Sequence, residues 1–308
     1  YATMSATDDL AFFLQISRAG TLSAAGQALG LSTAAVSRRL SALEARLGTR
    51  LLQRTTRRAT LTPEGELYLA EGQRILADLD DLEHRVRGDE DRPQGLLRVN
   101  ATFGFGRHHI APAVADFCAR HPEVEVQLHL SDRPASLDEG HDVVIRFGEV
   151  PDSRVTSRRL AANQRLLVAS PTYLRRHPEP SQPADLRQHP CIVIREAEDT
   201  YGSWHLHKGH ARATVKVSSP LSTNDGEVAL SWALRGLGVL MRSQWHVAPY
   251  LRSGRLRPVL PDWHLPAADI HAVYLARTPL SARVRAFVDH LDATFAPHRA
   301  AQARGEAW

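Results

Sequence analysis

Residues 21 to 47 carry the pattern that most restricts what this chain can fold into. A short alanine-rich segment, Ser23 to Leu29, ends at Gly30, a residue that readily takes the left-handed backbone angles found at helix ends. A second segment begins at Ser32, and its apolar residues recur at steps of four, three and four, namely Val36, Leu40, Leu43 and Leu47. Such spacing predicts an amphipathic helix with one buried stripe. Two helices joined by so tight a turn predict a helix-turn-helix, with Ser23 and Ser32 as the N-caps.

The face of the second predicted helix that lies opposite its apolar stripe carries Ala34, Arg38 and Ser41, with Ser37 and Arg39 at its flanks. This face is small, polar and cationic. The major groove of B-DNA is about 12 Å wide and admits such a helix, whose arginine and serine side chains can reach base edges and phosphates. The pattern therefore predicts DNA binding.

Positive charge is concentrated around this helix. Between Arg38 and Arg58 the chain has seven arginines against Glu44 alone, a local charge of +6, although the whole chain carries only +4. Residues 50–62 predict two short strands around an arginine-rich tip, a wing that contacts phosphates or the minor groove. A solvated charge run is the alternative, because arginine is used throughout a chain with only two lysines. The position of the arginines beside the helix-turn-helix favours DNA binding.

Two further helices frame this region. Ahead of it, Leu10, Phe13 and Leu14 predict a helix that begins behind two acidic residues and ends near Gly20. After it, Thr62-Pro63-Glu64 predicts the start of a long helix that reaches about Arg87. The apolar residues of that helix share one seam, namely Tyr68, Ile75, Leu79, Leu82 and Val86. The seam predicts a dimerisation helix, with packing against its own domain as the alternative.

From Leu96 the pattern changes to short apolar strands that alternate with helices, which predicts an α/β fold with an open, mostly parallel sheet. The expected strands are 96–101, 124–130, 142–147, 165–169, 191–195, 238–242 and 270–276, with a hairpin over 204–217. The expected helices are 107–121, 172–177, 224–235 (capped by Asn224), 245–251 and 281–295. The last strand and helix return to the first lobe, so two lobes joined by a double crossover are expected to enclose a cleft.

Ligands of such sheets bind beyond the carboxyl ends of the strands, near helix N-termini. Thr102 and Phe103 follow the first strand, and Asn224 precedes a later helix. Arg146 closes the strand 142–147, where its guanidinium suits a small carboxylate. Ordinary helix capping and a surface salt bridge are the alternatives for these residues. The carboxylate of Asp225 would repel an anion at this place.

Several classes of function find no support in the sequence. No apolar run approaches the roughly 18 residues of a membrane helix, and no secretory signal precedes or follows Met4, so a cytoplasmic location is expected. Cys118 and Cys191 predict core residues rather than a disulfide framework or a redox sensor. His205, His207 and His210 lack a carboxylate at ligand spacing, so neither a metal nor another cofactor is expected. Phosphate-binding loops, nucleophile elbows and metalloprotease motifs are absent, and no catalytic residue is predicted.

In order and spacing, these motifs resemble the LysR-type transcriptional regulators. The resemblance rests on Asp9-Leu10-Ala11-Phe12-Phe13, Gly20-Thr21-Leu22-Ser23-Ala24-Ala25, Leu29-Gly30-Leu31-Ser32, Ala35-Val36-Ser37-Arg38, Leu43-Glu44, Leu47-Gly48, Leu51-Leu52, Arg54 and Leu61-Thr62-Pro63-Glu64-Gly65. It is weaker in the second half, where Asp142–Gly148 and Gly236–Val239 look like family segments. Ala34 departs from the proline that many members carry early in the recognition helix.

The resemblance implies an α/β protein overall, with an N-terminal winged helix-turn-helix, a long linker helix and a two-lobed effector domain similar to periplasmic binding proteins. The implied domains are 4–62 (DNA binding), 63–88 (linker helix), 89–95 (hinge), 96–162 with 267–296 (first lobe), 163–266 (second lobe) and 297–308 (flexible tail). The implied DNA-contacting residues are Ser32, Thr33, Ala34, Ser37, Arg38 and Arg39 at the groove, with Arg54, Thr55, Arg57 and Arg58 on the wing.

The implied function is regulation of transcription by a homodimer or homotetramer that binds double-stranded promoter DNA. A small effector, an organic anion or an aromatic metabolite, is expected between the lobes, at Thr102, Phe103, Arg146 and Asn224. RNA polymerase is a further partner that the resemblance allows. The alternatives are a two-lobed solute-binding protein, or an enzyme that uses the cleft without reading DNA sequence. The N-terminal DNA-binding pattern and the absent signal peptide argue against the solute-binding protein. A regulator whose cleft binds no small ligand is a third alternative.

Overall fold

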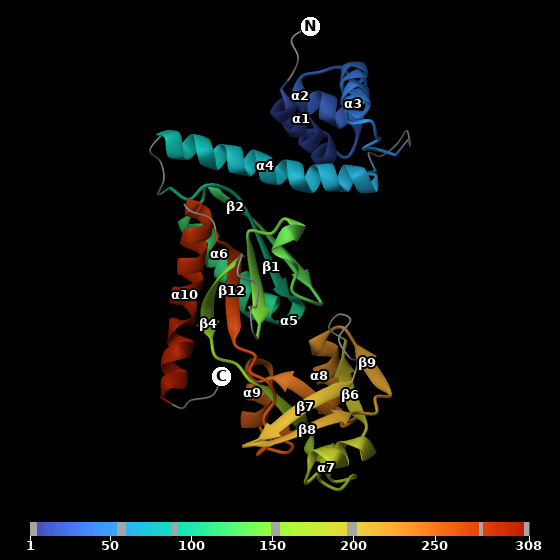
Figure 1. Cartoon of the computed structure of the whole chain (residues 1–308), viewed down its shortest axis with the longest axis vertical. Coiled ribbons are helices and arrows are strands. Elements are labelled where there is room, and N and C mark those ends of the chain that lie inside the picture. Colours follow the sequence, from blue (N-terminus) through green and yellow to red (C-terminus); the bar gives the residue numbers. More distant parts are fainter. Residues whose placement is uncertain are drawn as a thin grey trace. The chain divides into compact units, whose positions relative to one another are not determined.

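The computed structural model describes residues 5–53, 60–87, 92–148, 155–195, 202–276, 280–304 and 308. The chain divides into two compact units, Tyr1–Arg92 and Pro93–Trp308 (Figure 1). The described part of the first unit consists of four helices, α1 (Ala6–Ala19), α2 (Leu22–Leu29), α3 (Thr33–Leu47) and α4 (Pro63–Arg87). The helix-turn-helix is therefore confirmed as α2 and α3.

One apolar cluster holds the first unit together. Its fully buried members include Phe13 and Ile16 of α1, Ala25 of α2 and Val36 of α3. The edge of the Tyr68 ring meets the Phe13 ring at 5.5 Å between centroids, which packs α4 onto α1. The predicted apolar stripe of α3 is thus its buried face.

The turn between α2 and α3 depends on two glycines. Gly30 has φ +66°, as predicted for the end of α2, and a Cβ on Gly26 would lie 2.7 Å from the carbonyl oxygen of Leu31. Ser32 caps α3 through a 3.2 Å bond from the amide of Ala35. The prediction of Ser23 as the cap of α2 is wrong. The helix begins at Leu22, so Thr21 is the N-cap and accepts a bond from the amide of Ala24 at 3.1 Å.

The second unit contains two five-stranded sheets. The first has the order β2-β1-β3-β12-β4 and is formed by β1 (Gly95–Thr102), β2 (Val124–Ser131), β3 (Val143–Phe147), β4 (Val155–Ala161) and β12 (Ile270–Leu275). β1 runs parallel to β2 and β3, whereas β12 runs antiparallel to both of its neighbours. The predicted mostly parallel sheet is therefore mixed, because β12 re-enters the sheet from the opposite end.

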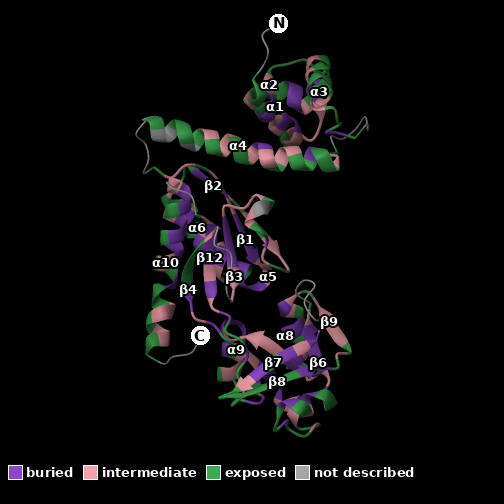
Figure 2. Cartoon of the chain, in the orientation of Figure 1, coloured by how far each residue is buried: buried purple, intermediate pink, exposed green. Residues whose placement is uncertain are grey.

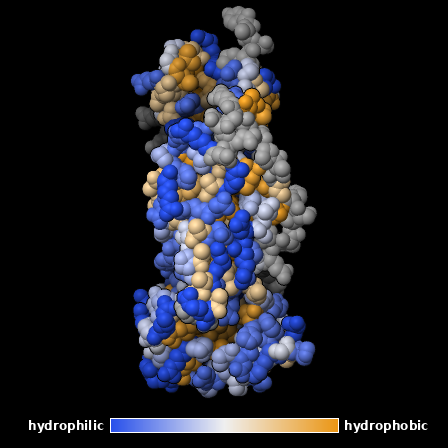
Figure 3. Space-filling model, turned by 90° about the vertical axis from the view of Figure 1, so that its left-hand side faces the viewer, coloured by the Kyte–Doolittle hydropathy of each residue, from blue (hydrophilic) through white to orange (hydrophobic). Residues whose placement is uncertain are grey.

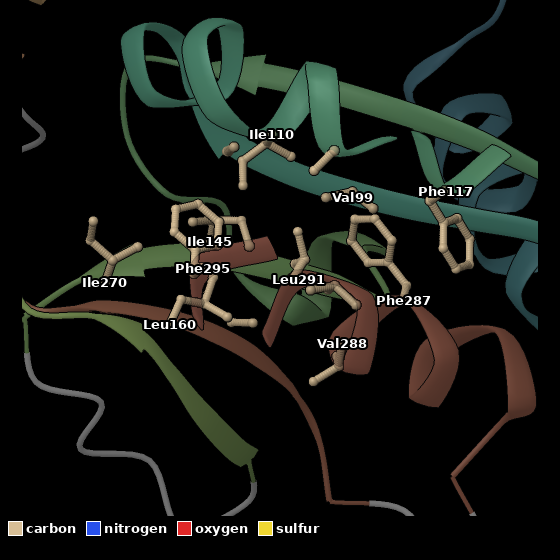
Figure 4. Close-up of a cluster of buried hydrophobic side chains, with 14 of the residues drawn as sticks. Val99, Ile110, Phe117, Ile145, Leu160, Ile270, Phe287, Val288, Leu291 and Phe295 are labelled. Atoms are coloured by element: carbon tan, nitrogen blue, oxygen red, sulfur yellow. The ribbon is translucent and has the colours of Figure 1, made fainter. Parts of the chain in front are cut away.

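One face of this sheet is covered by α6 (Ala111–Arg120) and α10 (Ala282–Ala303). Figure 4 shows the buried side chains between them, with Phe117 coming from α6 and Phe287, Leu291 and Phe295 from α10. α10 extends eight residues beyond the predicted end at Phe295, so residues 297–303, expected in a flexible tail, are helical.

The second sheet has the order β11-β5-β10-β6-β9 and is formed by β5 (Arg165–Ala169), β6 (Cys191–Ile194), β9 (Leu221–Thr223), β10 (Val239–Ser243) and β11 (Arg257–Pro258). It is also mixed. One face packs against α8 (Gly226–Leu234) and α9 (Gln244–Arg252). The other packs against α7 (Pro171–Leu174) and the predicted hairpin, which is present as β7 (Ser203–Lys208) and β8 (Ala211–Lys216).

Asn163 ties together the two segments that connect the sheets. Its amide nitrogen Nδ2 donates to the carbonyl of Ala268 at 3.0 Å, and its backbone N–H donates to Asp269 Oδ1 at 3.1 Å. Its Oδ1 accepts from the backbone N–H of Trp245 at 3.4 Å. The side chain is 4% exposed. Both crossings between the lobes, and the start of α9, thus meet at one buried amide.

The helical run after β1 and the cap of α8 differ from prediction. After β1 the chain turns at once into a helical run made of α5 (Phe103–Phe105), a π-helical turn (Gly106–Ile110) and α6, four residues earlier than the expected start at Arg107. Asp225, not Asn224, caps α8, because its Oδ1 accepts from the amides of Glu227 and Val228 at 2.7 and 3.3 Å.

No helix among the described residues is long and apolar enough to cross a bilayer. The face drawn in Figure 3 is largely hydrophilic, with hydrophobic residues in separate patches. Cys191 is fully buried, as predicted, and its burial raises the pKa of the thiol to about 12. Cys118 is half-buried on α6.

Candidate nucleic-acid interface and interlobe site

The predicted groove-facing residues lie on the solvent side of α3. Ser32, Thr33, Ala34, Ser37 and Arg38 are all exposed, in contrast to Val36 and Leu40 on the opposite side. Figure 2 shows this division of the helix into an exposed and a buried side. The exposed face combines small side chains with one long cation, as a helix in the major groove requires.

Arg39 does not belong to this face. Its guanidinium carbon lies 4.1 Å from the centroid of the Phe12 ring, and its Nη2 donates to the carbonyl of Asp8 at 2.9 Å. The same nitrogen is 3.9 Å from the Asp9 carboxylate. In this geometry the Arg39 side chain is directed toward α1, and its contact with the groove stays a prediction. Its side chain lies along α1, because position 39 is at the edge of the apolar stripe.

Asp9 is the centre of a contact between α1 and α3 that the sequence analysis did not find. Its side chain is 12% exposed and accepts a 2.9 Å bond from Arg46 Nη2. We had expected acidic residues here only to favour the positive end of the helix dipole. The opposite charges in α3 could have suggested a partner, but only the packing of α1 on α3 selects Arg46 over the other arginines.

The wing is described only at its base. Leu52 and Leu61 form an antiparallel bridge, and Gln53 N–H donates to the carbonyl of Thr60 at 2.8 Å. Glu44 Oε1 accepts from the backbone amides of Leu51 and Leu52 at 2.8 and 3.2 Å, so a carboxylate of α3 fixes where the wing begins. The predicted wing contacts Arg54, Thr55, Arg57 and Arg58 lie outside the described residues.

Polar side-chain contacts between the lobes use residues at the start of α8, and the Trp245 ring of α9 also contacts Phe105 of the first lobe. Asn224 Nδ2 donates to Asp132 Oδ2 at 3.2 Å. The Asp225 carboxylate lies 3.6 Å from Arg107 Nη2, and Glu227 Oε1 lies 2.8 Å from His108 Nε2. The partners from the first lobe follow β2 or lie in the π-helical turn after β1. The sequence analysis named Asn224 here but missed Arg107, His108 and Glu227.

The other predicted effector residues lie at the ends of β1 and β3. Thr102 ends β1 and makes no side-chain cap bond, and the Phe103 ring lies 5.4 Å from the guanidinium carbon of Arg107. Arg146 is half-buried and pairs with His271 of β12. Its neighbours in β3 point into the cluster under α6, so Arg146 projects to the other face of the sheet, as does Thr102.

Arg242 and His246 complete the surroundings of Glu227. Arg242 Nε donates to His246 Nδ1 at 2.8 Å, and His246 Nε2 lies 3.4 Å from Glu227 Oε2. Burial, followed by the charge of Arg242, lowers the pKa of His246 to about 4. Burial by itself would raise the pKa of Glu227, but His246, His108 and Arg242 outweigh it and hold that pKa below its usual value.

His108, Glu227 and His246 form a group of potential metal ligands, with ligand atoms within 4.8 Å of one another, that the sequence analysis did not predict. Their hydrogen bonds favour a different use. Because Nδ1 of His246 accepts a hydrogen bond from Arg242, the neutral ring carries its hydrogen on Nε2, and that atom donates rather than coordinates. In the hairpin, where no metal site is predicted, the His205 ring is hydrogen-bonded to Thr214 and the His207 ring lies beside His264.

Comparison with known proteins matches both units. Residues 7–66 match the model of the bacterial regulatory helix-turn-helix protein, lysR family, and residues 90–296 match the LysR substrate binding domain. The chain is 39% identical to the transcriptional regulator DmlR of Escherichia coli, over 94% of this chain and 95% of that protein. It is also 39% identical to the transcriptional activator TtdR of the same organism, over 92% of each.

Among solved structures, the full-length virulence activator AphB of Vibrio cholerae, described as a member of the LTTR protein family, superposes with a TM-score of 0.61 at 27% identity. The match covers 93% of this chain and 98% of that one. The similarity thus extends over both units and not over the helix-turn-helix alone.

Proposed function

Since the chain belongs to the LysR family and is a DNA-binding transcriptional regulator, we propose that it reads a promoter sequence with the exposed face of α3 and responds to a small effector held between its lobes. The observation that carries the proposal is the solvent-facing row of Ser37, Arg38 and Ala34, which no other described element covers. A row of small residues with one arginine lets the backbone approach the groove and leaves one long donor for a guanine edge or a phosphate.

The DNA contacts divide by chemistry. Ser32, Thr33, Ala34, Ser37 and Arg38 face the groove, while Arg54, Thr55, Arg57 and Arg58 of the wing supply contacts to phosphates. The phosphate contacts contribute affinity for any sequence, and they weaken as salt rises. Arg39 has a supporting role in this proposal, because it holds α3 against α1.

The protein acts as a homodimer or homotetramer. The apolar seam of α4 supports this assembly, because Ile75, Leu82 and Val86 are 45%, 48% and 80% exposed in the single chain. Because it binds promoter DNA, the protein acts in the cytoplasm. There, RNA polymerase is the partner through which DNA binding changes transcription. The role is regulatory rather than catalytic, in keeping with the named relatives.

The effector site lies where the lobes meet, at Thr102, Phe103, Arg146 and Asn224. Asn224 already bridges the lobes, and so does Arg107, whose guanidinium lies beside the Phe103 ring. A ligand at this place therefore changes how the lobes contact each other. An organic anion or an aromatic metabolite fits the donors and rings at this place. A difference in affinity between two lobe arrangements that is worth roughly 1 to 3 kcal/mol is enough to alter the contacts made on DNA.

The proposal is tested by selecting bound fragments from genomic DNA with the purified full chain, and then footprinting the best fragment with and without candidate metabolites. We expect protection of an interrupted palindrome, and a footprint that changes with one metabolite. Weak, salt-sensitive binding to all fragments alike would reject sequence reading by α3. A palindrome whose footprint no metabolite changes would reject the effector part alone.

A further inference from the structure

Glu227 stands in the contact between the lobes and is held from both sides. Its Oε1 accepts from His108 of the first lobe at 2.8 Å, and its Oε2 faces His246 of the second lobe at 3.4 Å. An imidazole nitrogen 2.8 Å from a carboxylate oxygen is the donor of that bond, since an ionised carboxylate only accepts. The low pKa of Glu227 means that its carboxylate is ionised at neutral pH.

The groups around this carboxylate are arranged as a receptor for an anion. His246 is fixed by Arg242 in the tautomer that donates from Nε2, and Arg242 itself brings a positive charge. Arg242 lies directly against the backbone of Gly226, where a Cβ would be 2.0 Å from its Nη2. A Cβ on Gly104 of the first lobe would lie 3.2 Å from the same nitrogen and 3.6 Å from Glu227 Oε1. Two glycines therefore leave room for the guanidinium and the carboxylate at the lobe contact.

His108 comes from the first lobe and His246 and Arg242 from the second, so an anion at this point contacts both lobes. Among the residues that the structure describes, Glu227 is the carboxylate bonded to His108, while the neighbouring Asp225 caps α8 and lies 3.6 Å from Arg107 Nη2. A metal ion would require His246 Nε2 to give up its proton while Nδ1 still accepts from Arg242, which a neutral ring cannot do. The site therefore selects a carboxylate rather than a cation.

We infer that Glu227 is an internal ligand that closes the lobes in the absence of effector, and that an effector bearing a carboxylate acts by taking its place on His108. This inference deepens the proposed effector function and rests on it, but the closure itself can be measured without DNA or effector. It gives Glu227 a regulatory part that the four predicted effector residues do not have.

The test replaces Glu227 with alanine in the full chain and offers small anions in solution. Spin labels on cysteines introduced at Glu125 of β2 and Arg212 of β8, both exposed, report the distance between the lobes, in a background with Cys118→Ser and Cys191→Ala. Dilution with unlabelled protein removes signals between subunits. We expect a narrow distance distribution in the parent, and a broader one with a longer mean in Glu227→Ala. Acetate should restore the parent distribution, while the neutral isostere acetamide should not.

Two further variants make the result decisive. Glu179→Ala, at an exposed glutamate of the second lobe, is the matched control and should leave the distribution unchanged. His108→Ala removes the donor, so it should open the lobes without recovery by acetate, and because His108 is half-exposed this variant retains the fold even if Glu227→Ala does not. An unchanged distribution in both Glu227→Ala and His108→Ala would overturn the latch. If the lobes of Glu227→Ala open and acetate does not restore the parent distance, the proposal that this place binds an anion is overturned.

The outcome is independent of the fragment selection. Failure of sequence-specific binding, with the labels behaving as expected, would reject the proposed DNA reading and leave the latch in place. Specific DNA binding with an unaltered distance distribution in the variants would reject the latch and leave the proposed DNA reading in place.

Discussion

Two neighbouring arginines of α3 show how far a side chain's role depends on its direction. Arg38 points to solvent, whereas Arg39 covers the ring of Phe12 and bonds to the backbone of Asp8. The periodicity of α3 places Arg39 at the edge of the exposed face. It does not determine whether the side chain points to solvent or packs against another helix. That decision comes from α1, whose residues lie about thirty positions earlier in the chain.

Arg38→Ala should therefore weaken binding to the selected DNA site by about 1 to 3 kcal/mol, since it removes a donor aimed at the groove. Binding to random DNA should fall much less. Affinities measured by fluorescence anisotropy at one fixed salt concentration check both values. An equal loss on specific and random DNA would show that Arg38 contacts phosphate only.

Arg39→Ala should act differently, because it removes packing on Phe12 and a bond to α1. We expect circular dichroism to show a lower melting temperature of the first unit. The affinity for DNA should fall in the same proportion for all sequences. Arg18→Ala, at an arginine in the last turn of α1, is the control for loss of charge alone. A selective loss of the specific site with unchanged melting would restore Arg39 to the groove.

Among the elements, those whose ends are encoded locally were predicted best. Gly30 and Ser32 are local signals, and both have the predicted role. β4, β9 and β11 were missed. β4 has no apolar alternation, since it contains a run of exposed polar residues with Arg158 and Arg159 side by side, and the other two strands have only two or three residues each. Their positions are set by pairing with distant strands, which single-chain patterns do not record.

The start of α4 depends on a close contact with the wing base. A Cβ on Gly65 would lie 2.1 Å from the carbonyl oxygen of Leu51, a backbone atom that cannot move aside. Gly65→Ala should therefore lower the free energy of unfolding by roughly 1 to 3 kcal/mol, measured in urea. Gly72→Ala in the same helix is the control, because there the clash is with the flexible end of the Leu10 side chain. Equal stability of the two variants would contradict this reason for a glycine at 65.

The exposed seam of α4 leads to another prediction. Leu82 is 48% exposed, and a charge there would be buried in a dimer but solvated in the single chain. Leu82→Asp should shift the sedimenting mass toward the monomer without changing helix content. Glu83→Asp, at the next position along the helix, is the control that changes side-chain size and keeps the charge. An unchanged mass for Leu82→Asp would place the dimer contact elsewhere.

For the whole molecule, the sequence predicted two lobes and the general place of their contact, but not the groups that make it. Thr102 and Asn224 could be proposed as effector residues because strand ends and helix starts can be recognised locally, and this role stays a prediction. His108 and Glu227 are 119 positions apart and became partners only through the double crossover. The resemblance to known regulators supplied the fold, because its motifs lie mainly in the helix-turn-helix and the linker helix.

The lobe contact should make stability depend on pH. His109 packs between the rings of Phe105 and Trp245, and its burial lowers its pKa from 6.5 to about 4. The neutral ring is therefore favoured when folded, so its contribution is complete above pH 6.5 and is lost as pH falls toward about 4. Thermal melts between these limits should show a steeper loss for the parent than for His109→Phe, which keeps an aromatic ring and cannot titrate. Parallel pH profiles of the two proteins would contradict this assignment.

The buried amide of Asn163 has a consequence for how the lobes can move. It fastens the outgoing segment to the returning one through Ala268 and Asp269, and it also holds the first residues of α9. Sliding the lobes past each other would break these bonds and leave a buried amide unpaired, whereas turning them about this point would keep the bonds intact. These bonds favour rotation of the lobes about Asn163 over sliding, so a small displacement of Glu227 from His108 becomes a larger movement at the far end of each lobe.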